Sequence, residues 1–219
     1  MTMTEAAEGG HQKDVLLVAT TNPGKLEEIA GILGDAPVTL VTLNDCEPLP
    51  EPEETGATFA ENARLKAQYY SEATGLISVA DDSGLEIAAL DNAPGVHSAR
   101  WHGTDYPTKF RKIQELFRER GVTGSAARFV CSIAVAQGPR ILFEAEGTVE
   151  GQIVDEPRGT NGFGYDPIFF YPPFNRTLAE LEAAQKSTVS HRGKAFGALR
   201  AYLVERDQRL AARDRSTSG

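Results

Sequence analysis

The sequence predicts an α/β fold, because strand-like and helix-like segments alternate from the start of the chain. Val15–Thr20 is a continuous apolar run, as expected of a strand that is buried on both faces. A glycine-containing turn follows, and apolar residues then recur at helical spacing from Leu26 to Leu33, before Gly34 ends the helix. Val38–Leu43 is a second strand candidate, so the chain opens with a βαβ unit.

The next segments lead to the strand around which we expect the fold to be organised. Asn44–Gly56 contains three prolines and is predicted to be irregular. Thr58–Glu61 forms a predicted capping box for a helix that Gly75 ends. Leu76–Leu85 then begins as an apolar strand, and we expect the strand to stop at a pair of adjacent carboxylates.

The second half of the chain is predicted to add a helix, a long antiparallel ribbon and a closing helix. The segments are Pro107–Arg120 as a helix, Ala127–Gln137 and Ile141–Val154 as the ribbon, Ile168–Tyr171 as a short strand, Thr177–Glu180 as a second capping box, and a last helix that Ser190 caps. Because no repeat or linker is found, residues 14–206 are predicted to form one domain. Residues 1–13 and 207–219 are predicted to be flexible tails.

The composition limits the class of partner. The 219 residues are 41% hydrophobic and 24% charged, as in globular proteins, and the formal net charge is −9. This charge argues against a nucleic acid or an anionic membrane as partner. No stretch approaches the roughly 18 apolar residues of a membrane span, and residues 1–13 lack an apolar signal core. Two cysteines in such a chain indicate reduced thiols, so we expect a cytoplasmic protein.

The turn after the first strand is a candidate phosphate-binding site. Its residues are Thr20, Thr21, Asn22, Pro23, Gly24 and Lys25. A helix N-terminus presents unpaired N–H groups and a positive dipole end, which suits phosphate, and Lys25 adds a positive charge. The spacing does not fit a P-loop. A plain turn with an exposed lysine is therefore the alternative.

Two pairs of carboxylates are candidate metal ligands. Asp81 and Asp82 would repel each other unless a cation or hydrogen bonds held them. Glu53 and Glu54 lie in the proline-rich segment, and a cation such as Mg²⁺ typically takes one or two carboxylates plus substrate phosphates. The alternatives are an Asx-type turn for the aspartates and a solvated surface for the glutamates.

Later segments contain candidate contacts for a nucleotide. In Gly159–Pro167, glycines flank Phe163, so a flat ligand could approach and stack on the ring, unless the ring is simply packed in the core. Lys186–Gly193 brings three cationic residue types to a predicted helix start, which is unfavourable unless an anion offsets them. Lys66 follows Asn62 by four residues and so shares its face of the predicted helix.

Seven short motifs occur in an order that is typical of one known family. They are Thr20–Lys25, Glu54–Gly56, Glu61–Ala63 with Lys66 and Ala67, Ala80–Gly84, Pro94 and Gly95 with Ser98–Arg100, Gly162–Pro167 and Ser190–Gly193. Together they resemble the Ham1 family of non-standard purine nucleoside triphosphate pyrophosphatases, over residues 14–204. Thr21 and Asn161 depart from the family pattern, but neither change removes a charged group.

The resemblance implies a fold and an activity. The implied fold is an elongated mixed β-sheet flanked by helices, with a central cleft between two lobes, and the implied assembly is a homodimer. The implied activity is Mg²⁺-dependent hydrolysis of ITP, dITP and XTP to the monophosphate and pyrophosphate. The alternatives are a Maf-like pyrophosphatase for other nucleotides and a nucleotide sensor without catalysis.

The resemblance also implies roles for individual residues. Asp82 is the implied general base and a metal ligand, and Glu54 is the other implied ligand, with Glu53 adjacent to it. The Thr20–Lys25 turn and Lys66 would hold the triphosphate. The nucleotide would also be bound by Ser83, Phe163, Gly164, Tyr165, Asp166, Lys186, His191 and Arg192.

Overall fold

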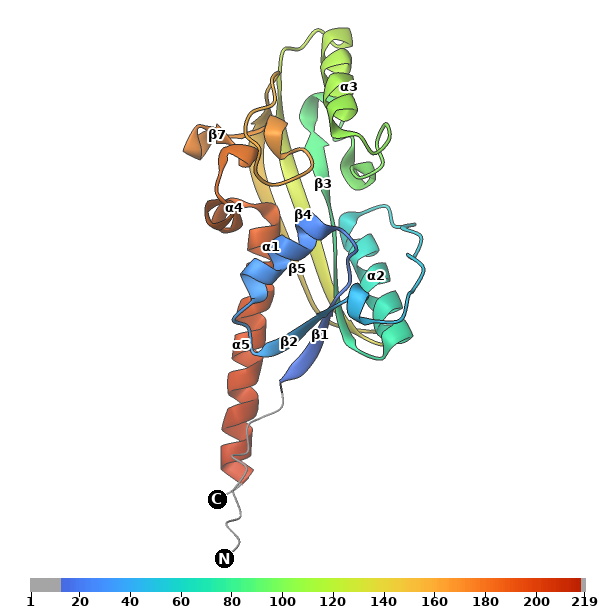
Figure 1. Cartoon of the computed structure of the whole chain (residues 1–219), viewed down its shortest axis with the longest axis vertical. Coiled ribbons are helices and arrows are strands. Elements are labelled where there is room, and N and C mark those ends of the chain that lie inside the picture. The colour runs from blue at the N-terminus through green and yellow to red at the C-terminus, as the bar shows by residue number, and fades with distance from the viewer. Residues whose placement is uncertain (1–12, 218–219) are drawn as a thin grey trace, which may run out of the picture.

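A mixed seven-stranded sheet forms the centre of the molecule, with strand order β2-β1-β3-β4-β5-β6-β7. The computed structural model describes residues 13–217, with side chains up to residue 213. Figure 1 shows an elongated molecule in which the longest strands follow the long axis. The strands are β1 (Asp14–Val18), β2 (Val38–Thr42), β3 (Ile77–Ile87), β4 (Ser125–Gln137), β5 (Arg140–Ile153), β6 (Phe169–Tyr171) and β7 (Arg176–Thr177).

The predicted βαβ unit and antiparallel ribbon are both confirmed. β1 pairs in parallel with β2 and with β3, whereas the pairs from β3 to β7 are antiparallel. The turn between β4 and β5 contains Gly138 at a φ of 55°, a value that L side chains rarely adopt. The fold class predicted from the sequence, an α/β mixed sheet flanked by helices, is therefore correct. The division into two lobes stays a prediction.

Helices cover the two faces of the sheet. α2 (Phe59–Thr74) packs on one face of β3 and β4, and α5 (His191–Thr217) packs on the opposite face with α1 (Pro23–Leu33) beside it (Figure 1). α3 (Tyr106–Glu119) and the short α4 (Ala183–Val189) complete the set in the described residues. Both capping boxes form, and Ser190 caps α5 as predicted, because its Oγ accepts from the N–H of Gly193 at 3.0 Å.

Alternation along β3 assigns its side chains to different cores. Ala80 packs with Ala63 and Ala67 under α2. Val79 packs with Ile29 of α1 and Phe196 of α5 on the other face. Because successive strand residues point to opposite faces, the two aspartates that follow must also point apart.

The sequence prediction for the end of the central strand is wrong. β3 does not stop or turn at Asp81 and Asp82 but runs on to Ile87, paired with β4 throughout. The pairing with β1, by contrast, ends at Val79, since β1 ends at Val18. One side of β3 is therefore free of a neighbouring strand from the aspartates onward, and the turn after β1 faces that space.

The segment predicted to be a C-terminal tail is helical for most of its length. α5 continues to Thr217, although residues 207–219 were predicted to be flexible. The segment is polar, but it contains no Gly or Pro between Ala198 and Thr217. Ion pairs of Arg209 with Glu205 and of Arg206 with Asp14 support the helix at 2.6 and 2.8 Å.

Two further expectations concern the ends of the chain and a membrane. Residues 1–12 of the predicted N-terminal tail lie outside the described residues, and the boundaries of the predicted domain, 14–206, stay a prediction. Among residues 13–217, no helix combines the length and apolar character that a membrane crossing requires.

Two glycines provide a test of the packing between β5 and α5. A Cβ at Gly147 would overlap the carbonyl of His191 and lie 2.7 Å from the N of Ala195, so we expect Gly147→Ala to destabilise the protein by about 1–3 kcal/mol. Gly197→Ala is the control, because nothing lies within 4 Å of that position, and better helix propensity should stabilise by about 0.5–1 kcal/mol. Urea unfolding measures both. Equal stability of the two variants would contradict the close approach.

Candidate active site

The turn after β1 presents polar groups around the start of α1. Asn22 caps the helix, since its Oδ1 accepts from the N–H of Lys25 at 3.1 Å. Thr20 Oγ1 accepts from the N–H of Asn22 at 3.2 Å. Lys25 Nζ lies 2.9 Å from Asp81 Oδ2, which holds the lysine beside the helix N-terminus. The turn therefore has the geometry that suits an anion.

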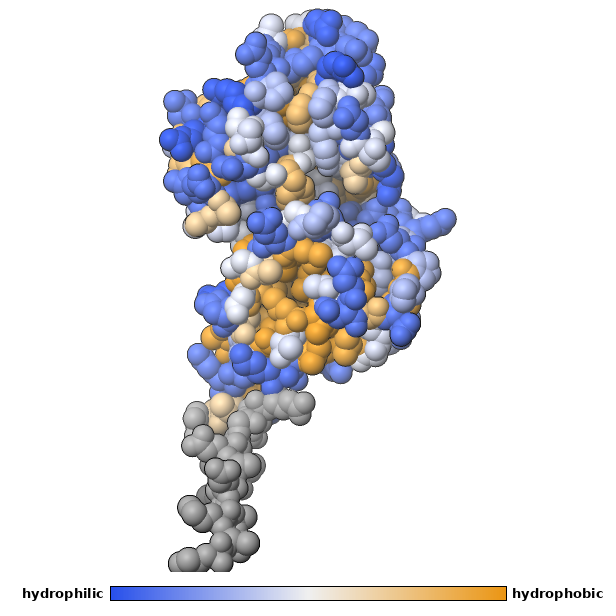
Figure 2. Space-filling model, viewed as in Figure 1, coloured by the Kyte–Doolittle hydropathy of each residue, from blue (hydrophilic) through white to orange (hydrophobic). Residues whose placement is uncertain are grey.

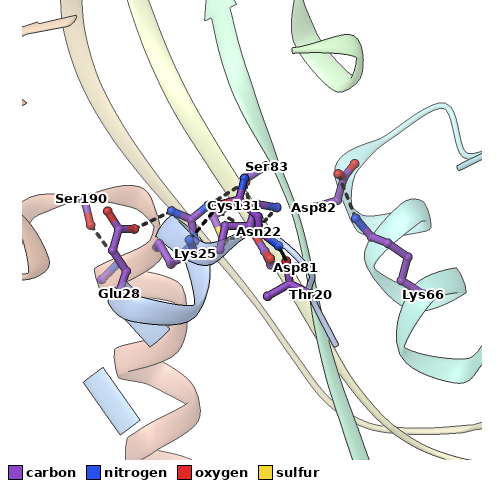
Figure 3. A network of polar contacts seen from close by, with 12 residues as sticks. Thr20, Asn22, Lys25, Glu28, Lys66, Asp81, Asp82, Ser83, Cys131 and Ser190 are labelled. Atoms are coloured by element: carbon purple, nitrogen blue, oxygen red, sulfur yellow. Dashed lines mark hydrogen bonds and ion pairs between the residues drawn. The ribbon is translucent and has the colours of Figure 1, made fainter. Parts of the chain in front are cut away.

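Asp81 points toward α1, where two cations and a hydroxyl lie close to one of its oxygens (Figure 3). Lys25 and Arg192 approach Oδ2 at 2.9 and 3.3 Å, and Ser83 donates to it at 3.1 Å. Burial would raise the pKa of Asp81, but Lys25 and Arg192 hold it well below the ordinary range. Asp81 is therefore a fixed anion that holds cations and is unsuited to accept a proton.

Asp82 points to the opposite side, toward α2 (Figure 3). Lys66 Nζ lies 3.2 Å from Asp82 Oδ1 and 2.7 Å from Glu54 Oε1, so it bridges the two carboxylates. Asn62 donates to Asp82 Oδ2 at 3.1 Å, and Arg100 donates to Glu54 Oε2 at 2.8 Å. Burial raises the pKa of Asp82, against the effect of Lys66. Burial opposes but does not cancel the lowering of the Glu54 pKa by Lys66 and Arg100.

The pair Glu54 and Asp82 fits a hard divalent cation. Lys66 places a positive nitrogen within reach of both carboxylates, and so stands where such a cation would be attracted. No cluster of three or more Asp, Glu, His or Cys suited to a metal occurs in the described part of the chain. Two carboxylates alone agree with the way Mg²⁺ is commonly held, with phosphates and water as the other ligands.

The loop from Phe163 to Asp166 forms the other end of the site. Asp166 accepts from the N–H of Phe163 at 2.8 Å and from Lys186. The Phe163 ring lies 5.0 Å from Lys186 Nζ and 5.5 Å from Arg192 Cζ. The ring also packs on Gly24, where a Cβ would come within 2.6 Å of it. The aromatic ring and the turn after β1 are therefore in direct contact.

Glu28 of α1 joins the two cations at this end of the site. Its carboxylate accepts from Lys186 Nζ and from Arg192 Nη1, each at 2.6 Å. Burial would lower the pKa of Lys186, but Asp166 and Glu28 raise it above its ordinary value. The anion that the sequence analysis required beside the Lys186–Gly193 segment is thus supplied by the protein itself, by Glu28 and Asp81.

His191 is held as a neutral ring. It stacks on Phe129 with ring centroids 4.7 Å apart and an interplanar angle of 11°. Burial, together with Arg192 and Lys186, lowers the pKa of His191 well below 6.5. Its Nδ1 is buried without a hydrogen-bond partner in the described residues. A neutral imidazole has one N–H donor to offer to a ligand.

Most of the predicted residues line two adjoining pockets that share Asn22, Lys25 and Glu54 and so form a continuous cleft. The first pocket also contains Thr20, Thr21 and Lys66. The second contains Asp82, Ser83, Phe163, Gly164, Tyr165, Asp166, Lys186, His191 and Arg192. Pro23 and Gly24 line neither pocket, because Pro23 begins α1 and Gly24 underlies the Phe163 ring.

Comparison with known proteins identifies the family. Residues 16–202 match the model of the Ham1 family. The chain belongs to the Ham1 family. A dITP/XTP pyrophosphatase of Syntrophobacter fumaroxidans is 49% identical over 184 residues, which cover 83% of this chain and 78% of that protein. One of Geobacter sulfurreducens is 45% identical, over 86% of this chain and 96% of the relative.

Solved structures of Ham1 proteins share the fold. A HAM1 protein from Coxiella burnetii aligns with a TM-score of 0.80 and 41% identity, covering 88% of this chain and 99% of that one. A nucleoside-triphosphatase, dITP/XTP pyrophosphatase, from Mycobacterium abscessus aligns with a TM-score of 0.66 and 42% identity, over 84% and 98% of the two chains. The roles of individual residues in this Ham1 chain stay predictions, although the structure gathers them in one cleft.

Sequence reasoning missed Glu28. The available signal was its position three residues after Lys25 on the predicted helix, which places both side chains on one face. A glutamate on a helix is usually solvated, so nothing in the sequence distinguished Glu28 from its neighbour Glu27. Only the fold brings Lys186 and Arg192, more than 150 residues away in the chain, to Glu28.

We expect Glu28→Gln to destabilise this Ham1 chain by about 1–3 kcal/mol, because Lys186 and Arg192 lose the charge that they share. Glu27→Gln is the matched control, since Glu27 is exposed and should change stability by less than about 0.5 kcal/mol. The folded pKa of Glu28 is lowered, so its contribution is present at neutral pH and lost as the pH falls below the ordinary 4.5. Denaturant titration at pH 7 and pH 4 measures this, and a gap between wild type and Glu28→Gln that widens in acid would contradict the assignment.

Proposed function

We propose that this chain hydrolyses ITP, dITP and XTP to the nucleoside monophosphate and pyrophosphate, in a reducing cytoplasm and with Mg²⁺. The observation that carries the proposal is the convergence of Lys25, Lys66, Glu54 and Asp82 with the Phe163 loop in one cleft. The names of the relatives, dITP/XTP pyrophosphatases, support the same activity. A purine triphosphate has an anionic chain that matches the end of the cleft with the lysines, and a flat base that matches the end with Phe163.

The triphosphate end of the cleft offsets negative charge. Lys25 and the start of α1 lie on one side, and Lys66 lies on the other. These groups counter the formal charge of −9, which would otherwise repel a polyphosphate. Glu54 and Asp82 would hold Mg²⁺, which supplies charge neutralisation on the phosphate oxygens when bound.

Asp82 is the group in position to accept the proton of an attacking water. Asn62 donates a hydrogen bond to its Oδ2. Lys66 donates to its Oδ1, which lies on the side of the cleft. Burial raises the pKa of Asp82 above that of a free aspartate, which makes it a stronger base near neutral pH. In the proposed reaction water attacks the α-phosphorus, and the bond from this phosphorus to the bridging oxygen of the β-phosphate breaks. Pyrophosphate leaves with the bonding electrons.

The purine end of the cleft offers an aromatic face and donors. Stacking of a base on Phe163 would contribute about 1–3 kcal/mol, by analogy with single-strand recognition. Arg192 and neutral His191 would donate to the 6-oxo group that hypoxanthine and xanthine share. An adenine 6-amino group would leave these donors unpaired, a mismatch that costs up to about 10⁴–10⁵ in specificity.

Pyrophosphate release from ITP, XTP, GTP, ATP and dTTP with Mg²⁺ tests the function. We expect ITP and XTP to exceed ATP by at least about 100-fold in kcat/KM, because their 6-oxo group accepts from the donors and the 6-amino group of ATP does not. Removal of the metal by a chelator should abolish release.

Asp82→Asn should abolish turnover while ITP affinity stays within a few-fold of wild type. A preference for dTTP would favour a Maf-like pyrophosphatase, and binding without turnover in wild type would favour a sensor.

We also propose that two copies of the chain form a homodimer through the face that carries β1 and β2. Figure 2 shows a continuous apolar region over these strands. β2 is an edge strand, and its Val38 and Leu40, which share a face, are only partly buried. A second copy would cover both the apolar side chains and the free strand edge. We expect sedimentation equilibrium to give twice the 23.6 kDa of one chain, whereas a single-chain mass at micromolar concentration would contradict this.

A further inference from the structure

Lys109 of α3 is a fully buried lysine that the proposed reaction does not use. Its side chain is 0% exposed. Nζ donates to the carbonyl oxygens of Ser98 and Ala99 at 3.0 and 2.6 Å. The same nitrogen lies 4.4 Å from the centroid of the Tyr106 ring and 5.6 Å from that of Tyr165. Backbone dipoles and aromatic faces thus stabilise the charge.

No carboxylate pairs with Lys109 among the described residues. Burial without such a partner is costly and lowers the pKa of Lys109. A neutral side chain such as methionine would fill the same volume without this cost. The lysine must therefore be useful for what Nζ holds, which is the backbone of Ser98 and Ala99.

Residues 98–100 form part of the wall of the cleft. Ala99 lines both pockets of the cleft. Arg100 lines the first pocket, at the triphosphate end, where it pairs with Glu54. The Ser98 hydroxyl accepts from the N–H of Leu85 at 2.9 Å, which ties the segment to β3 just beyond the aspartates. Gly84 permits this approach, since a Cβ there would overlap the segment.

The Ser98 carbonyl also connects this wall to the loop at the purine end. Tyr165 OH donates to it at 3.0 Å, so one oxygen accepts from both Lys109 and Tyr165. Burial raises the pKa of the Tyr165 hydroxyl, which therefore remains a donor. Tyr165 lies next to Asp166 and two residues after Phe163. The carbonyl is a junction between the two ends of the cleft.

We propose that Lys109 is a positioning residue that fixes the spacing between the Phe163–Asp166 loop and the Glu54–Arg100 pair, so that one nucleotide can contact both. This inference rests on the proposed function. A ligand that spans the cleft requires both ends at a fixed separation, and a misplacement of about 1 Å costs up to about 100-fold. A ligand that occupies only one end has no such requirement.

Titration calorimetry with three probes tests the spacing: the α,β-methylene analogue of ITP, IMP and inorganic tripolyphosphate, each with Mg²⁺. We expect Lys109→Met to weaken the ITP analogue by about 10- to 100-fold. IMP and tripolyphosphate occupy one end each, so their affinities should change by less than about threefold, because the spacing between the ends does not affect them.

Ile113→Val is the matched control, because Ile113 is buried on the same helix but does not contact residues 98–100 through a hydrogen bond. It should leave all three affinities unchanged. Tyr165→Phe removes the second donor to the Ser98 carbonyl and keeps the ring, so it should selectively weaken the ITP analogue, by less than Lys109→Met. This variant decides the question if Lys109→Met does not fold.

A uniform loss of affinity for all three probes in both Lys109→Met and Tyr165→Phe would overturn the proposal, as would unchanged affinity for the ITP analogue. Either result would leave Lys109 with a purely structural role. Failure of the proposed function is distinguishable, because it appears in the wild-type protein as an absence of affinity for the ITP analogue. Failure of the positioning role appears only in the variants.

Discussion

Two adjacent buried aspartates in the middle of a strand are the constraint on which the site depends. A strand sends Asp81 and Asp82 to opposite faces, so each makes its close ion pairs on its own face. Each face must supply its own cations, and these come from the elements that pack there: Lys25 and Arg192 on one side, and Lys66 on the other. Because the surroundings on the two faces differ, the pKa values of the two aspartates differ as well. Asp81 is held as a permanent anion, whereas Asp82 keeps a raised pKa that suits a base.

The charges around Asp81 alternate in sign across the molecule. From the purine end to the triphosphate end the order is Asp166, Lys186, Glu28, Arg192, Asp81 and Lys25, each in contact with the next. Removal of one member would take an opposite charge away from each of its buried neighbours, which is costly. The residues proposed to recognise the base and those proposed to hold the phosphates therefore belong to one electrostatic unit. The Ser98 carbonyl, which accepts from Lys109 and Tyr165, connects the same two ends through the backbone.

Much of the fold could be predicted from local patterns, but the exceptions have physical causes. The capping boxes at Thr58 and Thr177 and the strand at Val15 depend on short-range signals, and these predictions are confirmed. The run of Asp, Ser and Gly in β3 resembles a turn when only local propensity is considered. Its strand conformation is stabilised by the distant Arg192, which pairs with Asp81. Glu28 was missed for the same reason. Residues 207–217 were predicted to be flexible because polarity was given more weight than the absence of Gly and Pro.

The bridge from Lys66 to Glu54 and Asp82 has a consequence for the protein when divalent cations are scarce. Two carboxylates left facing each other without a counter-ion would push the loop of Glu54 away from β3. An ammonium group already in that place prevents the repulsion. With Mg²⁺ held by this pair, as proposed, depletion of the ion would silence the enzyme without unfolding it, and a store of intact molecules would regain activity as soon as the ion returned.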